Sequence, residues 1–350
     1  MGSSFMIKVF IVDDSITTRT FMSSLLENDA NIELVGQAQN GEDAVCKVPL
    51  IKPDVVVMDI NMPKLNGYEA TRMILENYPV PIVICSNIWQ PGEIVQCFET
   101  IEAGAVTAIP KPPGPGHPDY TRLTTQFVQT VKSMSEVKVI TRKRSFKEKK
   151  KEKHSFTGSR NKKNPYKILA IGASTGGPPV IKTILHGLGK DFPLPIVIVQ
   201  HIAEGFLEGM VSWLDQALEL QVKIATNSEQ LKPGYVYLAP NGYQINIQNR
   251  KITLSNTAPA ENGLRPAVSY LFRSLADHHA SETIGVLLTG MGKDGSKELK
   301  LLKQGGGMTI AQDEKTSVVH GMPGEAIRIG GVDHVLSPSA ITHLLLKTVH

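Results

Sequence analysis

Residues 168–181 read ILAIGASTGGPPVI, and this stretch passes from a strand pattern, through a loop of small residues, to the start of a helix. The apolar run ends at Gly172. Glycine-rich turns between a strand and a helix have two common uses: they bind a phosphate on backbone N–H groups, or they expose a nucleophile. The pattern G-x-S-x-G from Gly172 to Gly176 is typical of the second use. Ser174 is therefore a candidate nucleophile, and its partners must be sought elsewhere in the chain.

The C-terminal half repeats this alternation of strand and helix patterns. Apolar strand-like runs cover residues 167–174, 195–201, 234–240, 283–290 and 307–313. Helix-like segments, such as 206–218 and 267–279, lie between several of them. Because such alternation is typical of parallel α/β folds, we expect a mainly parallel, Rossmann-like α/β domain over residues 165–350.

His201 and Asp294 lie at or just beyond the ends of strand-like runs, as Ser174 does. The carboxyl ends of parallel strands meet at one edge of a sheet. Serine becomes nucleophilic when a neutral imidazole takes its proton and a carboxylate fixes the imidazole tautomer. The three residues make a hydrolase triad conceivable, in a chain order different from those of α/β-hydrolases, chymotrypsin-like proteases and subtilisins.

Two other interpretations of these residues stay open from spacing alone. His201 also suits the start of a helix without any chemical role, and the glycine-rich loop at Ser174 also suits a dinucleotide. That loop itself lacks the G-x-G-x-x-G pattern, and no clear acidic residue closes a second strand after it. The dinucleotide interpretation is weaker for that reason.

The N-terminal region contains a second series of strand-like runs. They cover residues 8–13, 32–38, 54–59, 81–86 and 105–110. Helix-like stretches separate these runs at roughly even intervals. The pattern predicts a doubly wound (βα)5 domain over residues 6–131, with function at the carboxyl ends of its strands.

Polar residues stand at those strand ends. Asp13 and Asp14 end the first run, Asp59 ends the third, Ser86 ends the fourth, and Lys111 follows the fifth. Three carboxylates at one edge repel each other unless a cation joins them, and such oxygen ligands suit Mg²⁺. Ser86 and Lys111 would then contact a phosphoryl group carried by one carboxylate. The alternative, that each aspartate is only a helix N-cap, explains a single residue better than it explains the set.

Composition sets the broad class of the protein. The chain has 350 residues, of which 41% are hydrophobic and 20% charged, as in ordinary globular proteins with enough material for two cores. No apolar run approaches the ~20 residues of a membrane span. The first ten residues lack the layout of a signal peptide. Three widely spaced cysteines predict neither a disulfide framework nor a zinc site. We expect a cytoplasmic monomer.

Charge is distributed very unevenly along the chain. Residues 1–130 have a net charge of −7, residues 138–163 of +10, and residues 164–350 of +1. The basic segment has few large apolar residues and no clear period, which predicts a flexible linker over residues 132–164. Such a linker has the charge to touch acidic protein or lipid surfaces.

The motifs of residues 6–130 resemble the receiver domain of two-component response regulators. The matching residues are VDDS at 12–15, MDINMP at 58–63, Gly67, and KP at 111–112. The resemblance implies that Asp59 accepts the phosphoryl group and that Asp13, Asp14, Asp59 and the backbone carbonyl of Asn61 hold Mg²⁺. Ala108 departs from the pattern, because many receivers carry an aromatic switch residue there.

Residues 165–350 resemble the catalytic domain of the CheB chemotaxis methylesterases. The matching stretches are IGASTGGP at 171–178, VIVQHI at 197–202, RPAVSYLF at 265–272, GVLLTGMGKDG at 285–295 and AQDEKTSVVHGMPGEA at 311–326. The resemblance implies that Ser174 is the nucleophile, His201 the base and Asp294 its orienting group. Thr175, Met291 and backbone N–H groups near His201 would line the oxyanion and substrate site. The resemblance implies no cofactor for the ester chemistry.

The same resemblance implies a function. The chain would remove methyl esters from glutamates of methyl-accepting chemoreceptors and deamidate receptor glutamines, after phosphorylation by a CheA-type histidine kinase. Gln244 lies where the family commonly has a nearby histidine, so we expect altered substrate contacts there.

Two other classes of function compete with this one. The basic segment suggests a DNA-binding response regulator, but residues 164–350 are nearly neutral and contain no helix-turn-helix pattern, so we expect no nucleic-acid partner. The other competitor is a catalytically silent interaction protein, and the intact set of triad residues argues against it.

Overall fold

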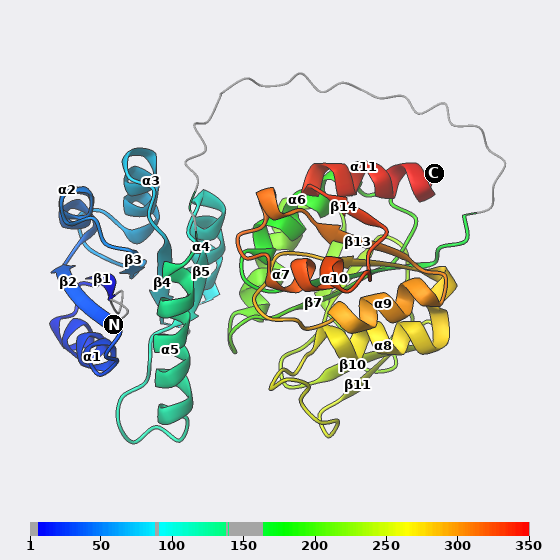
Figure 1. Ribbon diagram of the computed structural model, residues 1–350, viewed down its shortest axis with the longest axis horizontal. Helices are drawn as coiled ribbons and strands as arrows, with labels where there is room; N and C mark the ends of the chain where they lie inside the picture. Colours follow the sequence, from blue (N-terminus) through cyan, green and yellow to red (C-terminus); the bar gives the residue numbers. More distant parts are fainter. Residues whose placement is uncertain (1–5, 88–90, 138, 140–163, 350) are drawn as a thin grey trace.

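Two parallel β-sheets, each covered by helices on both faces, dominate the described part of the chain (Figure 1). The computed structural model describes residues 6–87, 91–137, 139 and 164–349. The expected class, two doubly wound α/β units in sequence, is confirmed.

The N-terminal sheet has the strand order β2-β1-β3-β4-β5, and all its strand pairs are parallel. Its strands are β1 (Ile7–Val12), β2 (Ile32–Ala38), β3 (Val55–Met58), β4 (Ile82–Ser86) and β5 (Thr107–Pro110). Its helices are α1 (Ile16–Glu27), α2 (Gly41–Ile51), α3 (Gly67–Asn77), α4 (Pro91–Ala103) and α5 (Tyr120–Ser135). Each of the five strand-like runs is a strand, within two residues at either end.

The apolar composition of β1 explains why this strand lies inside the sheet and not at its edge. Successive side chains of a strand point to opposite faces. Val9 and Ile11 pack in the core shared with α1 and α5, whereas Phe10 and Val12 pack in the core shared with α2, α3 and α4. Burying each such side chain stabilises the fold by roughly 1.5–3 kcal/mol. An uninterrupted apolar run therefore favours a strand covered on both faces.

The C-terminal sheet has the order β14-β13-β12-β6-β7-β9-β8, again with all pairs parallel. Its strands are β6 (Ile168–Ala173), β7 (Ile196–Gln200), β8 (Gln221–Ile224), β9 (Tyr235–Leu238), β12 (Thr283–Leu287), β13 (Met308–Gln312) and β14 (His334–Leu336). An antiparallel hairpin, β10 (Gln244–Gln248) and β11 (Lys251–Ser255), lies outside this sheet. The five strand-like runs of the sequence are β6, β7, β9, β12 and β13.

Helices cover both faces of this sheet, and alternate side chains of its strands point to one helix layer or the other. They are α6 (Gly177–Leu188), α7 (Leu207–Ala217), α8 (Val268–His279), α9 (Ser296–Gln304), α10 (Gly321–Arg328) and α11 (Pro338–Val349), with the short 3-10 helices η1 (Ala280–Glu282) and η2 (Glu314–Thr316). Leu169 and Ile171 face a core with α6, α7 and α11. Ile168 and Ala170 face a core with α8, α9, α10 and the hairpin.

Helix α4 of the N-terminal unit packs against α6 and α7 of the C-terminal unit (Figure 1). The Phe98 ring stacks on Trp213, with ring centroids 5.4 Å apart, and meets Phe206 edge-on at 6.5 Å. Lys182 Nζ forms an ion pair with Glu102 Oε2 at 2.7 Å. The contact is therefore mainly apolar and aromatic, with an ion pair beside it.

The basic linker is the least described part of the chain. Helix α5 continues to Ser135, so the first residues of the expected linker, 132–135, are helical. Residues 138 and 140–163, which carry nearly all of the linker charge, lie outside the described residues.

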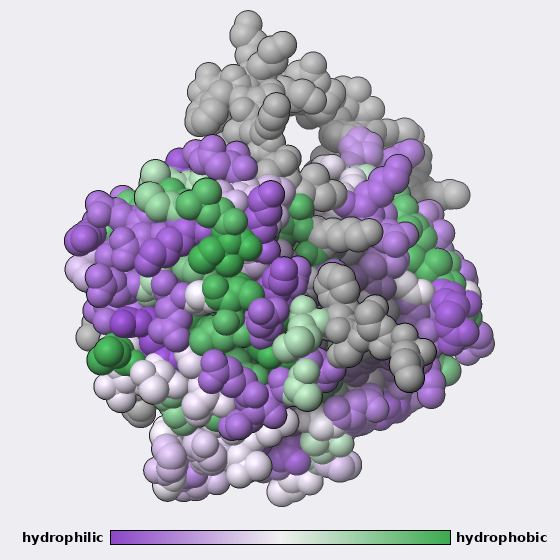
Figure 2. Space-filling view, turned by 60° about the vertical axis from the view of Figure 1, so that its left-hand side comes forward, coloured by the Kyte–Doolittle hydropathy of each residue, from purple (hydrophilic) through white to green (hydrophobic). Residues whose placement is uncertain are grey.

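The surface mixes polar and apolar side chains. Figure 2 shows a largely hydrophilic face with a band of apolar side chains among the polar ones. Within the described residues, none of the helices has the length and apolar content needed to span a bilayer.

Candidate active site and phosphorylation site

The candidate triad lies at the carboxyl edge of the C-terminal sheet. Ser174 directly follows β6, His201 directly follows β7, and Asp294 lies in the loop between β12 and α9. Strands β12, β6 and β7 are neighbours, so three segments far apart in sequence end side by side. The structure thus places the three predicted residues on adjacent strands of one edge.

Asp294 connects His201 to the start of helix α8. His201 Nε2 lies 2.9 Å from Asp294 Oδ2. The backbone N–H groups of Val268 and Ser269 donate to the same carboxylate at 2.6 and 3.0 Å. Asp294 therefore satisfies unpaired donors at the positive end of a helix while it holds the imidazole.

These contacts determine the ionisation state of Asp294. Burial acts to raise the pKa of its carboxyl, but the hydrogen bond from His201, the imidazolium charge and the hydrogen bonds at Ser269 outweigh burial and hold the pKa below its usual value. An ionised carboxylate only accepts hydrogen bonds. His201 must therefore donate from Nε2, which leaves Nδ1 as the unprotonated nitrogen of the neutral ring.

Ser174 is held by its backbone on a tight turn. Its N–H donates to Thr289 O at 3.0 Å, and Gly176 has a φ of 75°, a left-handed conformation that favours glycine. The side chain is partly exposed. Among the hydrogen bonds of the described residues, none joins the Ser174 hydroxyl to His201. Loose contacts of this kind are common in enzymes without bound substrate.

The loop from Thr289 to Gly292 lies against the nucleophile. A Cβ on Gly290 would lie 2.7 Å from Ser174 Cβ, so only glycine allows this approach. Met291, the next residue, is 56% exposed. Thr175 lies beside the same loop, because Thr289 Oγ1 donates to its carbonyl at 2.9 Å. Both residues predicted for the oxyanion and substrate site are thus close to Ser174.

The structure reveals two features of this edge that the sequence analysis missed. Residues 290–295 form a G-x-G-x-x-G pattern between β12 and α9, a spacing that in other proteins marks dinucleotide loops. Here the pattern contains Asp294, and its first glycine, Gly290, permits the close approach to Ser174. The second feature is Gln200, whose side chain contacts the backbone of both Ser174 and His201.

Gln244 itself has a structural role in the C-terminal unit. Its side chain is fully buried and cannot reach a substrate. Its Nε2 donates to Pro259 O at 3.1 Å and to Leu264 O at 3.2 Å, while Oε1 accepts from Ala267 N at 2.9 Å. Gln244 therefore braces the loop that leads into α8, the helix whose N-terminus holds Asp294.

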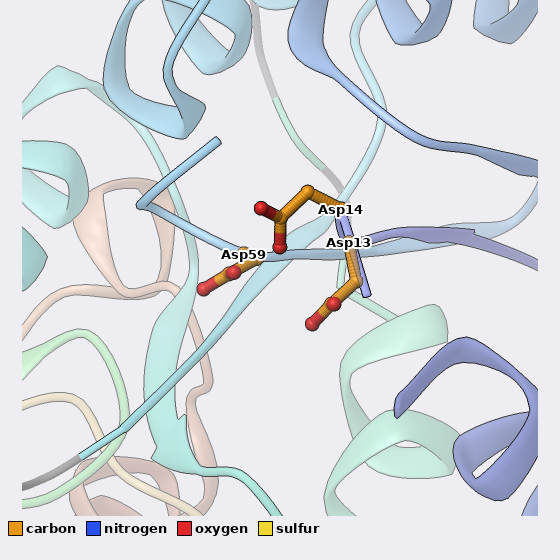
Figure 3. Close-up of side chains that lie close together, drawn as sticks. All are labelled: Asp13, Asp14 and Asp59. Carbon is orange, nitrogen blue, oxygen red and sulfur yellow. The ribbon is translucent and has the colours of Figure 1, made fainter. Parts of the chain in front are cut away.

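The second candidate site is a cluster of carboxylates at the edge of the N-terminal sheet. Asp13, Asp14 and Asp59 follow β1 and β3, and Figure 3 shows their side chains close together. One ligand atom from each lies within 4.8 Å of the others. Lys111 Nζ lies 2.6 Å from Asp13 Oδ2 and 2.8 Å from Asp59 Oδ2. The four charged residues expected at strand ends thus form one cluster.

Burial and charge act against each other in this cluster. Burial, aided by the Asp13 charge, raises the pKa of Asp59 to about 6, although Lys111 opposes it. Burial acts to lower the pKa of Lys111, but the two carboxylates outweigh burial and raise it. Hence Asp59 is ionised at neutral pH, and its ionisation lowers the free energy of unfolding. A positive charge in addition to Lys111 would reduce this loss of stability.

The donor set fits Mg²⁺. It consists of oxygen ligands, with Asp13 and Asp59 buried and Asp14 exposed, so a hydrated cation has an open side to approach. Ser86 is buried at the end of β4, and its Oγ has no hydrogen-bond partner among the described residues. Asn61 is exposed two residues after Asp59, and Ala108 is half-buried in β5.

Two family models match this chain. The model described as CheB methylesterase matches residues 169–345, and the model described as response regulator receiver domain matches residues 9–117. A protein-glutamate methylesterase/protein-glutamine glutaminase of Geobacter metallireducens is 49% identical over 97% of this chain and 98% of its own length. A relative of the same name from Nitrosospira multiformis is 45% identical over 98% and 97%.

One solved structure supports the same conclusion. The Thermotoga maritima CheB methylesterase catalytic domain is 42% identical, with a TM-score of 0.50, and the match covers 52% of this chain and 98% of that one. Fold and comparisons together define the class as a response regulator receiver joined to a methylesterase domain. The chain belongs to the CheB methylesterase family.

The raised pKa of Asp59 predicts a pH-dependent stability. Its carboxyl binds a proton more tightly in the folded state, so folding is destabilised as pH rises from about 4 to 6, by roughly 2–3 kcal/mol. Asp59→Asn, a neutral replacement, should therefore raise the free energy of unfolding at pH 7 without divalent cations, and much less at pH 4.5. Urea unfolding at both pH values measures this.

The same urea unfolding, repeated with Mg²⁺, tests the metal site. Mg²⁺ should stabilise the wild type at pH 7 more than at pH 5, because protons compete for the carboxylates, and should have little effect on Asp59→Asn. Equal gains from Mg²⁺ in both proteins would contradict the assignment of the metal site.

Proposed function

We propose that this chain is a phosphorylation-regulated protein-glutamate methylesterase. It hydrolyses γ-methyl esters of glutamates on methyl-accepting chemoreceptors and also deamidates receptor glutamines. The observation that carries the proposal is the His201–Asp294 pair beside Ser174 on adjacent strands, in a chain whose relatives bear the names of these two activities.

The reaction begins with attack of Ser174 Oγ on the ester carbonyl carbon. As the new bond forms, His201 Nδ1 takes the hydroxyl proton, and Asp294 stabilises the imidazolium through Nε2. The tetrahedral intermediate collapses, and the methoxy group leaves as methanol with the proton from His201. Water then attacks the acyl-enzyme by the same route, which restores Ser174 and frees the glutamate carboxylate.

The negative charge of the tetrahedral intermediate develops beside the turn at Ser174. The N–H of Ser174 is already bonded to Thr289 O, so donors must come from neighbouring groups. Thr175 and the loop that carries Met291 lie beside the nucleophile, and we assign them to this role. Glutamine deamidation follows the same steps, with ammonia leaving in place of methanol.

The receiver would regulate this chemistry. Asp59 accepts a phosphoryl group from a CheA-type histidine kinase, with Lys111 and Ser86 placed to contact the phosphoryl oxygens. Mg²⁺, held by Asp13, Asp14, Asp59 and the Asn61 carbonyl, would neutralise charge on the phosphoryl group during transfer.

Helix α4 is the element by which the receiver restrains the active site. Its Phe98 contacts Phe206, five residues after His201, and Trp213 in α7. We infer that this contact masks the substrate approach and that phosphorylation weakens it. Removal of methyl groups restores negative charge to the receptor, so the enzyme acts in adaptation of a chemotaxis-like pathway. We place it in the cytoplasm, as a monomer without nucleic-acid partners.

Replacing the nucleophile tests the esterase assignment. Ser174→Ala should lower kcat for methanol release from methylated receptor by a factor on the order of 10⁶. Ser339→Ala, an exposed serine of the same unit, is the control and should match wild type. Circular dichroism and urea unfolding should be unchanged in both. A Ser174→Ala variant that keeps a tenth of wild-type turnover would overturn the assignment.

Replacing the phosphoacceptor distinguishes activation by phosphorylation from the esterase reaction itself. Asp59→Asn should abolish the increase in activity caused by a small phosphodonor and leave basal activity intact. The control is Asp54→Asn at the opposite end of β3, which should still be activated. Activation of Asp59→Asn to the wild-type level would exclude Asp59 as the acceptor.

The α4–α7 contact offers a direct test of masking. A Cβ on Gly209 would lie 2.1 Å from Ile94 Cγ2, so Gly209→Ala should push the helices apart and raise basal activity severalfold. Gly114→Ala, which meets no neighbour, is the control. Wild-type basal activity in Gly209→Ala would argue against masking by this contact.

A further inference from the structure

Gln200 joins the backbones of the candidate nucleophile and base. It is the last residue of β7, and its side chain is only 4% exposed. Its Nε2 donates to the carbonyl oxygen of Ser174 at 2.8 Å and to that of His201 at 2.8 Å. A single planar amide group thus holds two residues that lie 27 positions apart along the chain.

The orientation of this amide is fixed by what surrounds it. If the amide were reversed, its oxygen would face two carbonyl oxygens, which cannot donate a hydrogen bond. Oε1 therefore points the other way, and it has no hydrogen-bond partner among the described residues. It lies instead against Gly177, the first residue of α6, where a Cβ would be only 2.2 Å away. The positive end of that helix favours an oxygen at this place.

The Gln200 amide also explains why residue 177 is glycine. The φ of Gly177 is not in the left-handed region, so backbone conformation does not require glycine there. The lack of space requires glycine instead, because an added methyl group would collide with Gln200 Oε1 and lie 2.8 Å from Ala173 Cβ. Gly177 N also donates to Ser174 O at 2.9 Å, so the same carbonyl receives both contacts. Gln200 and Gly177 therefore form one packed unit under the turn at Ser174.

We propose that Gln200 is a positioning residue that sets the distance between Ser174 and His201, with Gly177 providing the space for its amide. This inference rests on the triad in the proposed function. The Ser174 hydroxyl and His201 share no hydrogen bond among the described residues, so their alignment comes from the backbone. Outside the amide, the β6–β7 ladder and the bond from His201 N to Ala173 O at 2.9 Å join the backbones of the two segments.

Loss of this link should affect the chemical step rather than substrate binding. Small misplacements of reacting groups cost up to about 10²-fold in rate. Gln200 touches no substrate position on its own, because it is buried beneath the turn. Its removal should therefore lower kcat and leave KM for a small ester nearly unchanged.

The experiment compares Gln200→Met with Thr283→Val in the full-length protein, saturated with a small phosphodonor so that masking is constant. Methionine keeps the volume and removes both N–H donors. Thr283 is a buried residue at the opposite end of β12 whose hydroxyl donates to His279 O at 2.8 Å, so its replacement removes a comparable buried hydrogen bond. We expect kcat to fall 10- to 100-fold in Gln200→Met and to stay within twofold in Thr283→Val.

A double-mutant cycle tests the role of Gly177. Gly177→Ala keeps the amide but displaces it, and should lower kcat by a similar factor. Added to Gln200→Ala, whose short side chain leaves free the space that the new methyl group would occupy, it should cause little further loss. Additive losses would overturn the role assigned to Gly177. If Gln200→Met fails to fold, Gly177→Ala alone tests the proposal.

The outcomes distinguish this inference from the proposed function. Wild-type kcat in Gln200→Met, or in Gly177→Ala, together with an inactive Ser174→Ala, overturns the positioning role and leaves the triad standing. An active Ser174→Ala overturns both. Reaction with a fluorophosphonate probe reports on Ser174 directly, and its rate should fall in parallel with kcat in Gln200→Met and not in Thr283→Val.

Discussion

The parallel register of β12, β6 and β7 is the constraint on which the candidate active site depends. Parallel pairing forces all three strands to end at one edge, and each end delivers one polar residue. Burial of the apolar strands on both faces stabilises this register, since a shift by one residue would turn core side chains toward the wrong face. The catalytic arrangement is thus a consequence of core packing, refined by contacts such as the Asp294 carboxylate at the start of α8.

The N-terminal sheet uses the same constraint for a different purpose. Here the strand ends bring together carboxylates whose mutual repulsion and burial oppose folding, and Lys111 offsets only part of that cost. Binding of a positively charged group at this edge is favoured, because it reduces the repulsion between the buried carboxylates. The carboxylate cluster therefore lowers the stability of the fold and raises the affinity of the site for a cation, as buried charge clusters at functional sites commonly do.

The sequence could predict what depends on long apolar runs and could not predict what depends on contacts between loops. Central strands such as β6 and β12 are continuous apolar runs, so their ends, and the residues that follow them, could be placed. Strands β8 and β14 are short and partly exposed. The hairpin strands QINIQ and KITLS alternate strictly between polar and apolar residues, a strand signal that the sequence analysis missed. Gln200 looks like an ordinary strand end in VIVQHI, and only the folded backbone brings the Ser174 carbonyl to its amide.

The apolar character of the contact between the two units limits how a signal can pass from one site to the other. The contact of α4 with α7 is built from rings, Phe98 against Trp213 and Phe206, with a Lys182–Glu102 pair beside it. Apolar contacts respond little to a new charge, so added phosphoryl charge cannot weaken them directly. A ligand shifts a conformational equilibrium only by its different affinity for the two states. In the proposed function, the receiver would therefore bind the phosphoryl group better in a state where α4 has moved, and we assign that difference to Ser86, at the strand end that precedes α4.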